Sequence, residues 1–147
     1  RVLFRSERIK MLELAFEQEI KKGRVKISLI ENEISGKSYT YKTVKKLKKN
    51  HPKKRFLWTI GTDILHQIKD RYKFNELKDE VSFIVLQRPG YEYIDVEGVN
   101  IWKFLEINLE GISSTEIREN IKNHDKLKSL LNSKVLDFIN EQGLYKK

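Results

Sequence analysis

Apolar residues along the chain recur either at helical spacing or in short runs, and this predicts helices and strands in turn. Four apolar segments predict strands, over residues 25–29, 56–60, 81–86 and 102–109. Residues at helical spacing predict helices around these strands: one from Glu7 with Ser6 as its N-cap, then others over 40–51, 64–68, 75–80, from 114 onward and around 135–139. Apolar strands that alternate with helices are typical of a parallel sheet. We therefore predict an α/β fold in which helices flank a parallel sheet.

The loops that follow the strands are the candidate ligand sites, because ligands of open α/β sheets bind beyond the carboxyl ends of the strands. The first candidate is G-I-S-S-T-E-I-R at 111–118, where a strand precedes and a helix follows. Free backbone N–H groups at a helix N-terminus attract anions, and Arg118 would add a bidentate phosphate contact. The same letters are typical of a plain helix cap with a surface arginine, so the motif alone leaves both interpretations open.

The second candidate is I-G-T-D at 60–63, which ends the apolar segment 56–60. Glycine at position 61 lets a ligand approach the backbone, and the Asp63 carboxylate can accept hydrogen bonds from ribose hydroxyls. A tight-turn glycine followed by a capping aspartate gives the same letters. The loop therefore predicts either a nucleotide contact or a simple helix start.

The charge balance favours anionic partners: 30 Lys and Arg residues oppose 21 Asp and Glu residues in a chain of 147, for a net charge of +9. Eight of the fourteen residues from Lys42 to Arg55 are basic. This run is either a patch that steers nucleic acid or phosphate, or the solvated face of a lysine-rich helix. No aromatic residue lies within the run, so stacking on nucleic-acid bases is not indicated.

Composition excludes several other chemistries. The chain has no cysteine, which excludes disulfides, thiolate catalysis and cysteine-based zinc sites. Its histidines, at 51, 66 and 124, do not have metal-ligand spacing. No apolar stretch approaches the ~18 residues of a membrane span, so we predict no membrane partner and a cytoplasmic location. Trp58 and Trp102 fall in predicted strands, where we expect them to be core residues.

Four short motifs follow one another along the chain in a definite order. They are G-x-S-Y-T-x-x-T at 36–43, I-G-x-D-x-L at 60–65, R-P-G-Y at 88–91 and I-S-S-T-x-I-R at 112–118, with a closing G-L-Y at 143–145. In these motifs and their spacing the chain resembles the bacterial nicotinate-nucleotide adenylyltransferases of the HxGH nucleotidyltransferase superfamily. The resemblance extends from about Arg5 to Tyr145. It implies a Rossmann-like nucleotidyltransferase fold, as a single domain over residues 1–147.

The resemblance also implies a reaction and a set of site residues. ATP and nicotinate mononucleotide would be the substrates, with Mg²⁺ accompanying ATP, and deamido-NAD and pyrophosphate the products. No covalent enzyme intermediate forms in this family. The implied ATP-binding residues are Gly61, Asp63, Arg88, Ile112, Ser113, Ser114, Thr115 and Arg118, and of these Ser114, Thr115 and Arg118 would stabilise phosphate charge during catalysis. The implied mononucleotide-binding residues are Ser38, Tyr39, Thr40, Arg71 and Tyr72.

Two features depart from the family pattern. The family's G-x-F-x-P-x-H-x-G-H loop belongs to a first βα unit that would precede Arg1. We therefore expect this chain to be the C-terminal portion of a longer enzyme, and we expect the 147 residues by themselves to be inactive. In addition, Arg71 stands where the family often has a tryptophan that stacks on the pyridine ring. Its guanidinium could stack in the same way, pair with the nicotinate carboxylate or point away.

Two other functions remain alternatives to the enzyme. A non-catalytic relative would share the motifs and lack the histidine loop. A basic nucleic-acid-binding α/β domain would rest on the net charge and the run from Lys42 to Arg55. We favour the adenylyltransferase, which predicts no nucleic-acid partner and is compatible with a homo-oligomer.

Overall fold

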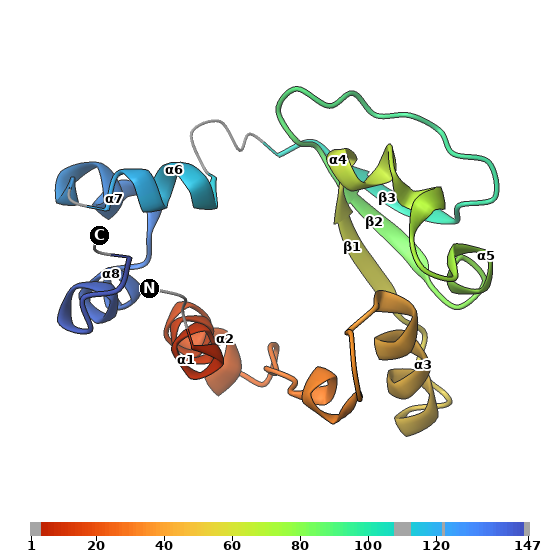
Figure 1. The fold of residues 1–147 in the computed structure, drawn as a ribbon, viewed down its shortest axis with the longest axis horizontal. Helices are drawn as coiled ribbons and strands as arrows, with labels where there is room; N and C mark the ends of the chain where they lie inside the picture. The colour runs from red at the N-terminus through yellow and green to blue at the C-terminus, as the bar shows by residue number, and fades with distance from the viewer. Residues whose placement is uncertain (1–3, 108–112, 122, 146–147) are drawn as a thin grey trace. The chain divides into compact units, whose positions relative to one another are not determined.

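A parallel three-stranded sheet organises the middle of the chain in the computed structural model, which describes residues 4–107, 113–121 and 123–145 (Figure 1). The strands are β1 (Leu57–Gly61), β2 (Ser82–Leu86) and β3 (Ile101–Leu105). β2 lies between the other two and pairs in parallel with both. This confirms the predicted α/β class. Because all three strands are parallel, their carboxyl ends lie at one edge of the sheet.

Helices precede, connect and follow these strands. In chain order they are α1 (Arg5–Ala15), α2 (Glu17–Lys21), the 3-10 helix η1 (Ile30–Glu33), α3 (Thr40–Asn50), α4 (Thr62–Leu65), the 3-10 helix η2 (Ile68–Asp70), α5 (Phe74–Leu77), α6 (Ser114–Glu119), α7 (His124–Leu130) and α8 (Ser133–Glu141). None of these helices has the length and apolar composition that crossing a membrane needs, as far as the described residues extend. The chain divides into two compact units, and we describe each by itself.

The sheet unit comprises Leu29–Glu110. Its core is centred on β2, where the side chains of Phe83 and Val85 are almost fully buried. Val44 of α3 and Leu65 of α4 pack into the same cluster. A strand covered on both faces needs apolar residues at nearly every position, which explains why V-S-F-I-V-L at 81–86 is a continuous run rather than an alternation.

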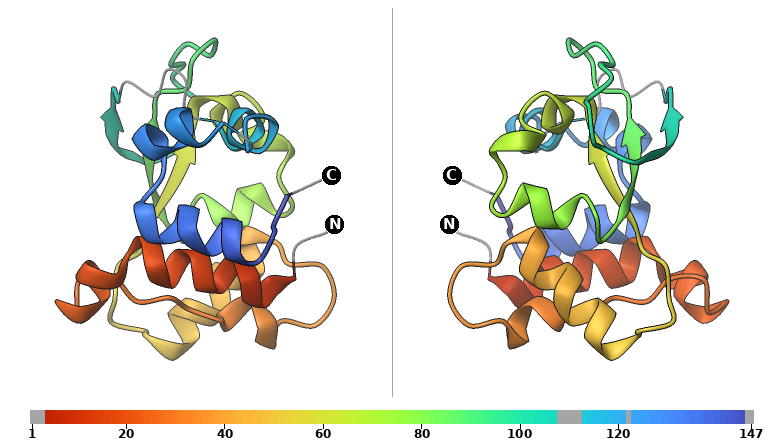
Figure 2. Two further views of the ribbon diagram at one scale, coloured as in Figure 1. Left: turned by 90° about the vertical axis from the view of Figure 1, so that its left-hand side faces the viewer. Right: turned by 90° about the vertical axis from the view of Figure 1, so that its right-hand side faces the viewer.

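The helical unit comprises Arg1–Ser28 and Gly111–Lys147. Its core consists of Ile121, Leu127, Val135, Leu136, Ile139 and Leu144. Helices α1 and α8 lie side by side in Figures 1 and 2. The Glu17 carboxylate accepts hydrogen bonds from Lys134 of α8 and Lys21 of α2. These two ammonium groups lower the pKa of Glu17 to about 2.

Two local predictions at the N-terminal side of the chain are wrong. Residues 25–29 form no strand, because the Val25 N–H donates to the Glu19 carbonyl at 3.2 Å instead of to a neighbouring strand. The alternating apolar residues at 25 and 27 form the half-buried side of an irregular segment. Ser6 does not cap the first helix but lies inside α1, whose N-cap is Phe4. The Phe4 N–H donates instead to the Glu7 carboxylate at 2.7 Å.

Other predictions change in extent or in burial. The helix expected at 75–80 is α5, which begins at Phe74 and ends at Leu77, and α7 has no counterpart among the predicted helices. The last predicted strand is β3, and the end of its expected range at 108–109 lies outside the described residues. Trp102 is 53% exposed, so its assignment to the core is wrong. It lies on an edge strand, where one backbone edge and part of each face meet solvent.

Candidate functional site

The carboxyl end of β1 forms a tight corner at Gly61, which is also the N-cap of α4. A Cβ atom at this position would lie 2.2 Å from Oδ1 of Asp63 and 2.9 Å from Cγ of Arg88. Real Cβ atoms do not approach other atoms this closely, so the two side chains can fold over the backbone only because residue 61 is glycine. The structure thus brings together Gly61, Asp63 and Arg88, which the resemblance assigns to ATP. We call these three residues with Thr62 the Gly61 corner.

The corner is held together by the buried Thr62 hydroxyl. Thr62 has no exposed surface, and its Oγ1 accepts a hydrogen bond of 2.9 Å from the Arg88 backbone N–H. This bond joins the end of β1 to the loop after β2. The Arg88 Nε atom lies 3.9 Å from Asp63 Oδ1, and both side chains remain partly exposed. The corner therefore presents a cation and a carboxylate to solvent on a fixed backbone.

Sequence reasoning did not assign a role to Thr62. Its function depends on the N–H of a residue 26 positions away, which no local pattern reveals. The available signal was a hydroxyl residue directly after a strand-ending glycine, which is a position where side chains commonly bond to a neighbouring loop.

A cavity of about 300 Å³ opens beside this corner, and Gly61 is one of its lining residues. Thr40, the first residue of α3, lines it from one side, and Arg71 after η2 lines it from another. Apolar walls come from Trp58, Ile60, Ile64, Ile68, Leu77 and Phe83. Arg71 is the single charged residue among those that line the cavity in the described part of the chain. The cavity is therefore suited to a flat, mainly apolar group that carries one negative charge.

Tyrosines surround the same part of the sheet unit. The rings of Tyr39 and Tyr72 stack with their centroids 4.3 Å apart, and Tyr41 meets Tyr72 edge-on at 6.4 Å. The structure thus places Tyr39 beside Tyr72, and Thr40 with Arg71 at one cavity. The other three members of the predicted mononucleotide set, Ser38, Tyr39 and Tyr72, do not line that cavity, and Ser38 is exposed.

The predicted phosphate motif begins helix α6 in the helical unit. The Ser113 hydroxyl accepts a hydrogen bond of 3.0 Å from the Glu116 N–H, which confirms the predicted cap. Arg118 donates from Nη2 to the Ser114 hydroxyl at 2.8 Å, so two of the three predicted catalytic residues are in direct contact. Thr115 is exposed, and Ile112 lies outside the described residues.

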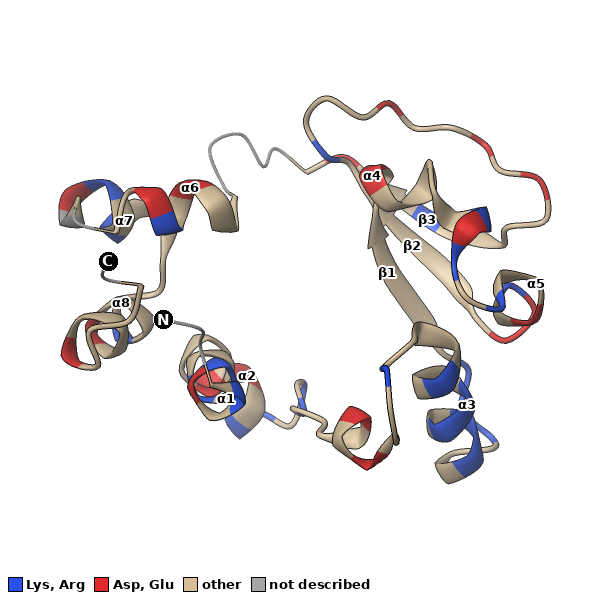
Figure 3. Cartoon of the chain, viewed as in Figure 1, with Lys and Arg blue, Asp and Glu red and all other residues tan. Residues whose placement is uncertain are grey.

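The lysine-rich run is largely the exposed face of α3 (Figure 3). Lys45 and Lys48 both pair with the Glu80 carboxylate, at 3.0 and 2.7 Å, and Lys46 pairs with Glu33 at 2.7 Å. The hydrogen bonds from Lys48 and Lys45 lower the pKa of Glu80, and the same carboxylate raises the pKa of Lys45. Several of these charges therefore already have partners, which favours the solvated-face interpretation of the run.

The fold and the Gly61 corner together define a nucleotidyltransferase of the cytidylyltransferase-like class. The sequence model of that family, described as "Cytidylyltransferase-like", matches residues 2–120. The solved structure of the nicotinic acid mononucleotide adenylyltransferase of Plasmodium falciparum complexed with APC has the same fold. Its TM-score is 0.82 at 22% identity, over 98% of this chain and 77% of that one.

More narrowly, the chain belongs to the nicotinate-nucleotide adenylyltransferase family. It is 34% identical over 138 residues to the nicotinate-nucleotide adenylyltransferase of Bacillus subtilis, covering 94% of this chain and 70% of that protein. It is 37% identical over 141 residues to the "Probable nicotinate-nucleotide adenylyltransferase" of Bacillus cytotoxicus, covering 95% of this chain and 70% of that protein. The chain thus spans about 70% of the length of these relatives.

Proposed function

We propose that this protein transfers the adenylyl group of ATP to nicotinate mononucleotide, forming deamido-NAD and releasing pyrophosphate. Membership of the family supports the reaction, and the geometry of the sheet unit supports the placement of its two substrates. The observation that supports placing the two substrates side by side is the position of Gly61. This one residue belongs both to the corner with Asp63 and Arg88 and to the lining of the 300 Å³ cavity.

ATP is proposed to bind at the corner side of Gly61. The glycine lets the nucleotide approach the backbone, the Asp63 carboxylate accepts hydrogen bonds from the ribose hydroxyls, and Arg88 offers charge to the phosphates. The start of α6, in the helical unit, is proposed as a phosphate-binding element in its own right. Because α6 has only six residues, we attribute the attraction there to the Arg118 guanidinium and the Ser114 hydroxyl rather than to the helix dipole.

Nicotinate mononucleotide is proposed to bind at the cavity side of Gly61. The apolar walls suit the pyridine ring, and the Thr40 backbone together with Arg71 faces its carboxylate. Tyr39 and Tyr72, whose rings stack on each other, adjoin Thr40 and Arg71 in the sequence and are proposed to contact the mononucleotide from outside the cavity. Arg71 then favours nicotinate over nicotinamide, since its guanidinium forms a bidentate ion pair with a carboxylate but not with the neutral carboxamide.

The proposed chemistry needs positioning more than covalent catalysis. A mononucleotide phosphate in the cavity would reach the α-phosphate of an ATP molecule held at the corner, and pyrophosphate would leave as the new bond forms. Cations around the transferred group stabilise its developing charge. Mg²⁺ is proposed to arrive with ATP as part of that substrate. No group of three or more His, Asp or Glu side chains within the described residues forms a metal site, and Mg²⁺ bound to nucleotides commonly relies on substrate phosphates and water.

A pair of variants tests this arrangement in the full protein. Pyrophosphate release that requires both ATP and nicotinate mononucleotide tests the reaction itself. Arg88→Gln should raise the KM for ATP, and Arg71→Gln should raise the KM for nicotinate mononucleotide, each by about tenfold for one lost charge-assisted contact. The matched control is Lys69→Gln, which removes a nearby exposed charge that lines no part of the cavity.

The arrangement fails if both variants change the KM of the same substrate, or if Lys69→Gln has the effect of Arg71→Gln. Absence of pyrophosphate release in the full protein would refute the reaction and favour the non-catalytic alternative. The cytoplasmic location, the homo-oligomer, the single domain over 1–147 and the role of Ser38 stay predictions.

A further inference from the structure

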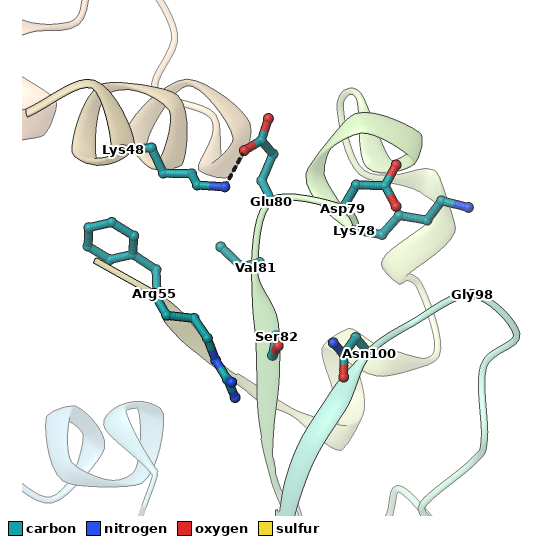
Figure 4. Close-up of a pocket in the computed structure, with 10 residues that line it drawn as sticks. Lys48, Arg55, Lys78, Asp79, Glu80, Val81, Ser82, Gly98 and Asn100 are labelled. Atoms are coloured by element: carbon teal, nitrogen blue, oxygen red, sulfur yellow. Dashed lines mark hydrogen bonds and ion pairs between the residues drawn. The ribbon is translucent and has the colours of Figure 1, made fainter. Parts of the chain in front are cut away.

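A second cavity, of about 450 Å³, lies at the amino ends of the strands, opposite the carboxyl ends where the Gly61 corner lies (Figure 4). Three of its lining residues directly precede the three strands: Phe56 before β1, Val81 before β2 and Asn100 before β3. The Gly61 corner lies at the carboxyl ends of the same strands, so the cavity is separate from the proposed adenylyl-transfer site. Nothing in the proposed reaction uses it.

Cations without partners line this cavity. Its Glu80 carboxylate is already shared by Lys45 and Lys48, which leaves Glu80 and Lys48 paired with each other. Arg55 and Lys78 also line the cavity, and within the described residues neither forms an ion pair. The remaining carboxylate, Asp79, is exposed. The lining therefore combines three cations with two acids, and its unpaired charge is mainly positive.

The Ser82 hydroxyl adds an uncharged donor at the cavity. The residue is 8% exposed and lines the cavity, and its hydroxyl forms no hydrogen bond with another described residue. Because no buried polar side-chain atom among the described residues lacks a partner, this hydroxyl meets solvent at the cavity, where a ligand oxygen can replace water. The Phe83 N–H donates to the Asn100 carbonyl at 2.8 Å, which holds Asn100 on the strand beside Ser82.

Gly98 gives the Lys78 ammonium its place at the cavity. The residue has a φ of +78°, and a Cβ atom there would lie 3.3 Å from the Lys78 Nζ atom. Any other residue would be strained at this backbone angle and would also crowd the ammonium. The loop before β3 is therefore shaped so that Lys78 can extend along it.

We propose that this cavity binds a small molecule carrying a phosphate monoester. Arg55 supplies a bidentate contact, Lys78 a second positive charge, and Ser82 and Asn100 uncharged hydrogen-bond donors. This set matches the three oxygens and near-double charge of a phosphate monoester better than a carboxylate, which has two oxygens and one charge. The volume lies in the range of small-molecule sites, so there is room for an organic body against Phe56 and Val81.

Backbone-amide NMR of the full protein tests the proposal, with a non-hydrolysable ATP analogue present at saturation to occupy the proposed catalytic site. The probes are ribose 5-phosphate and inorganic phosphate. Ribose 5-phosphate should cause saturable shifts at the amides of Ser82, Gly98 and Asn100, with a lower Kd than inorganic phosphate. Arg55→Gln should raise that Kd by about tenfold.

The matched control is Lys53→Gln, which removes an exposed charge two residues away that does not line the cavity. It should change the Kd by less than about twofold, as expected for a screened surface charge. Equal effects of Lys53→Gln and Arg55→Gln would show diffuse attraction and overturn the site. Absence of saturable shifts at the three amides would do the same. A Kd no lower for ribose 5-phosphate than for inorganic phosphate would overturn the claim that the ligand has an organic body.

Discussion

The Gly61 corner and helix α3 both present cations on the sheet unit, but they are built differently. At the corner a single arginine is tethered through its backbone N–H to the buried Thr62 and held 3.9 Å from Asp63. On α3 many lysines lie along an exposed helix, where Lys45 and Lys48 share the Glu80 carboxylate and Lys46 pairs with Glu33. The number of charges determines how strongly anions concentrate near a surface, whereas fixed donors determine where one anion binds. The corner is therefore the better candidate site although it has fewer charges.

The largest expected effect comes from filling the corner. Gly61→Ala should lower kcat/KM roughly a hundredfold, because the new Cβ would force Asp63 and Arg88 away from their positions, and misplacement by about 1 Å can cost that much. Steady-state kinetics would measure the loss, and thermal unfolding would show that the protein still folds. Gly23→Ala is the control, since Gly23 has a positive φ but no atom within 4 Å of its Cβ position. If the two variants were equally active, the close approach at Gly61 would have no functional meaning.

The next test compares Arg118, a cation at the start of α6, with Lys45, a cation on the exposed face of α3. Arg118→Ala should weaken ATP binding by about tenfold to a hundredfold, as expected for hydrogen bonds to a charged group, and Arg118→Lys should recover only part of the loss. Lys45→Ala should change the affinity little, because Lys45 is exposed and paired with Glu80. The measurement is calorimetry of ATP binding at two salt concentrations. Equal losses for the two alanine variants would indicate diffuse charge and favour the nucleic-acid alternative.

Removal of the Thr62 hydroxyl should have a moderate effect on stability. Thr62→Val keeps the shape of the side chain but leaves the Arg88 N–H without its acceptor, which should cost about 1–3 kcal/mol of the free energy of unfolding. Urea unfolding would measure this loss. Thr59→Val on β1, three residues before Thr62, changes an exposed side chain and should be nearly neutral, because valine is favoured in strands. A neutral Thr62→Val would mean that the corner does not depend on this bond.

The smallest expected effect concerns the shared carboxylate on the α3 side. The pKa of Glu80 is lower in the folded protein than its ordinary value of 4.5, so Glu80 stabilises the fold above pH 4.5 and loses this contribution as the pH falls through its folded pKa. Glu80→Gln should therefore be slightly less stable at pH 7, by under about 1 kcal/mol. The difference from the parent should vanish in acid. A difference that grew as the pH fell would contradict this assignment.

Buried elements of the sheet were predictable from the sequence, whereas boundaries and exposed segments were less so. V-S-F-I-V-L indicated β2 because a covered strand requires apolar residues throughout. Residues 25–29 show a strand-like alternation but no strand forms, because strand formation depends on a partner that local spacing cannot reveal. Trp102 is a large apolar residue of the kind expected in the core, yet its position on an edge strand leaves it exposed.

The site residues that lie within short sequence motifs were predictable from the sequence. Asp63 and Arg88 come from different motifs, and the parallel sheet brings the two loops to one edge. What the motifs did not indicate is the bond that fixes them, since the Thr62 hydroxyl and the Arg88 N–H are 26 residues apart. The cavity lined by Arg71 likewise depends on α3, η2 and β1 meeting in three dimensions.

The bond between Thr62 and Arg88 also has a consequence for motion. The Arg88 side chain is about half exposed, but its backbone N–H donates to a hydroxyl with no exposed surface. Hydrogen exchange at this amide therefore requires the corner itself to open, rather than a local excursion of the surface loop. The exposed guanidinium can reorient quickly while the backbone of residue 88 stays in place. Residue 88 therefore combines a mobile side chain with a fixed backbone.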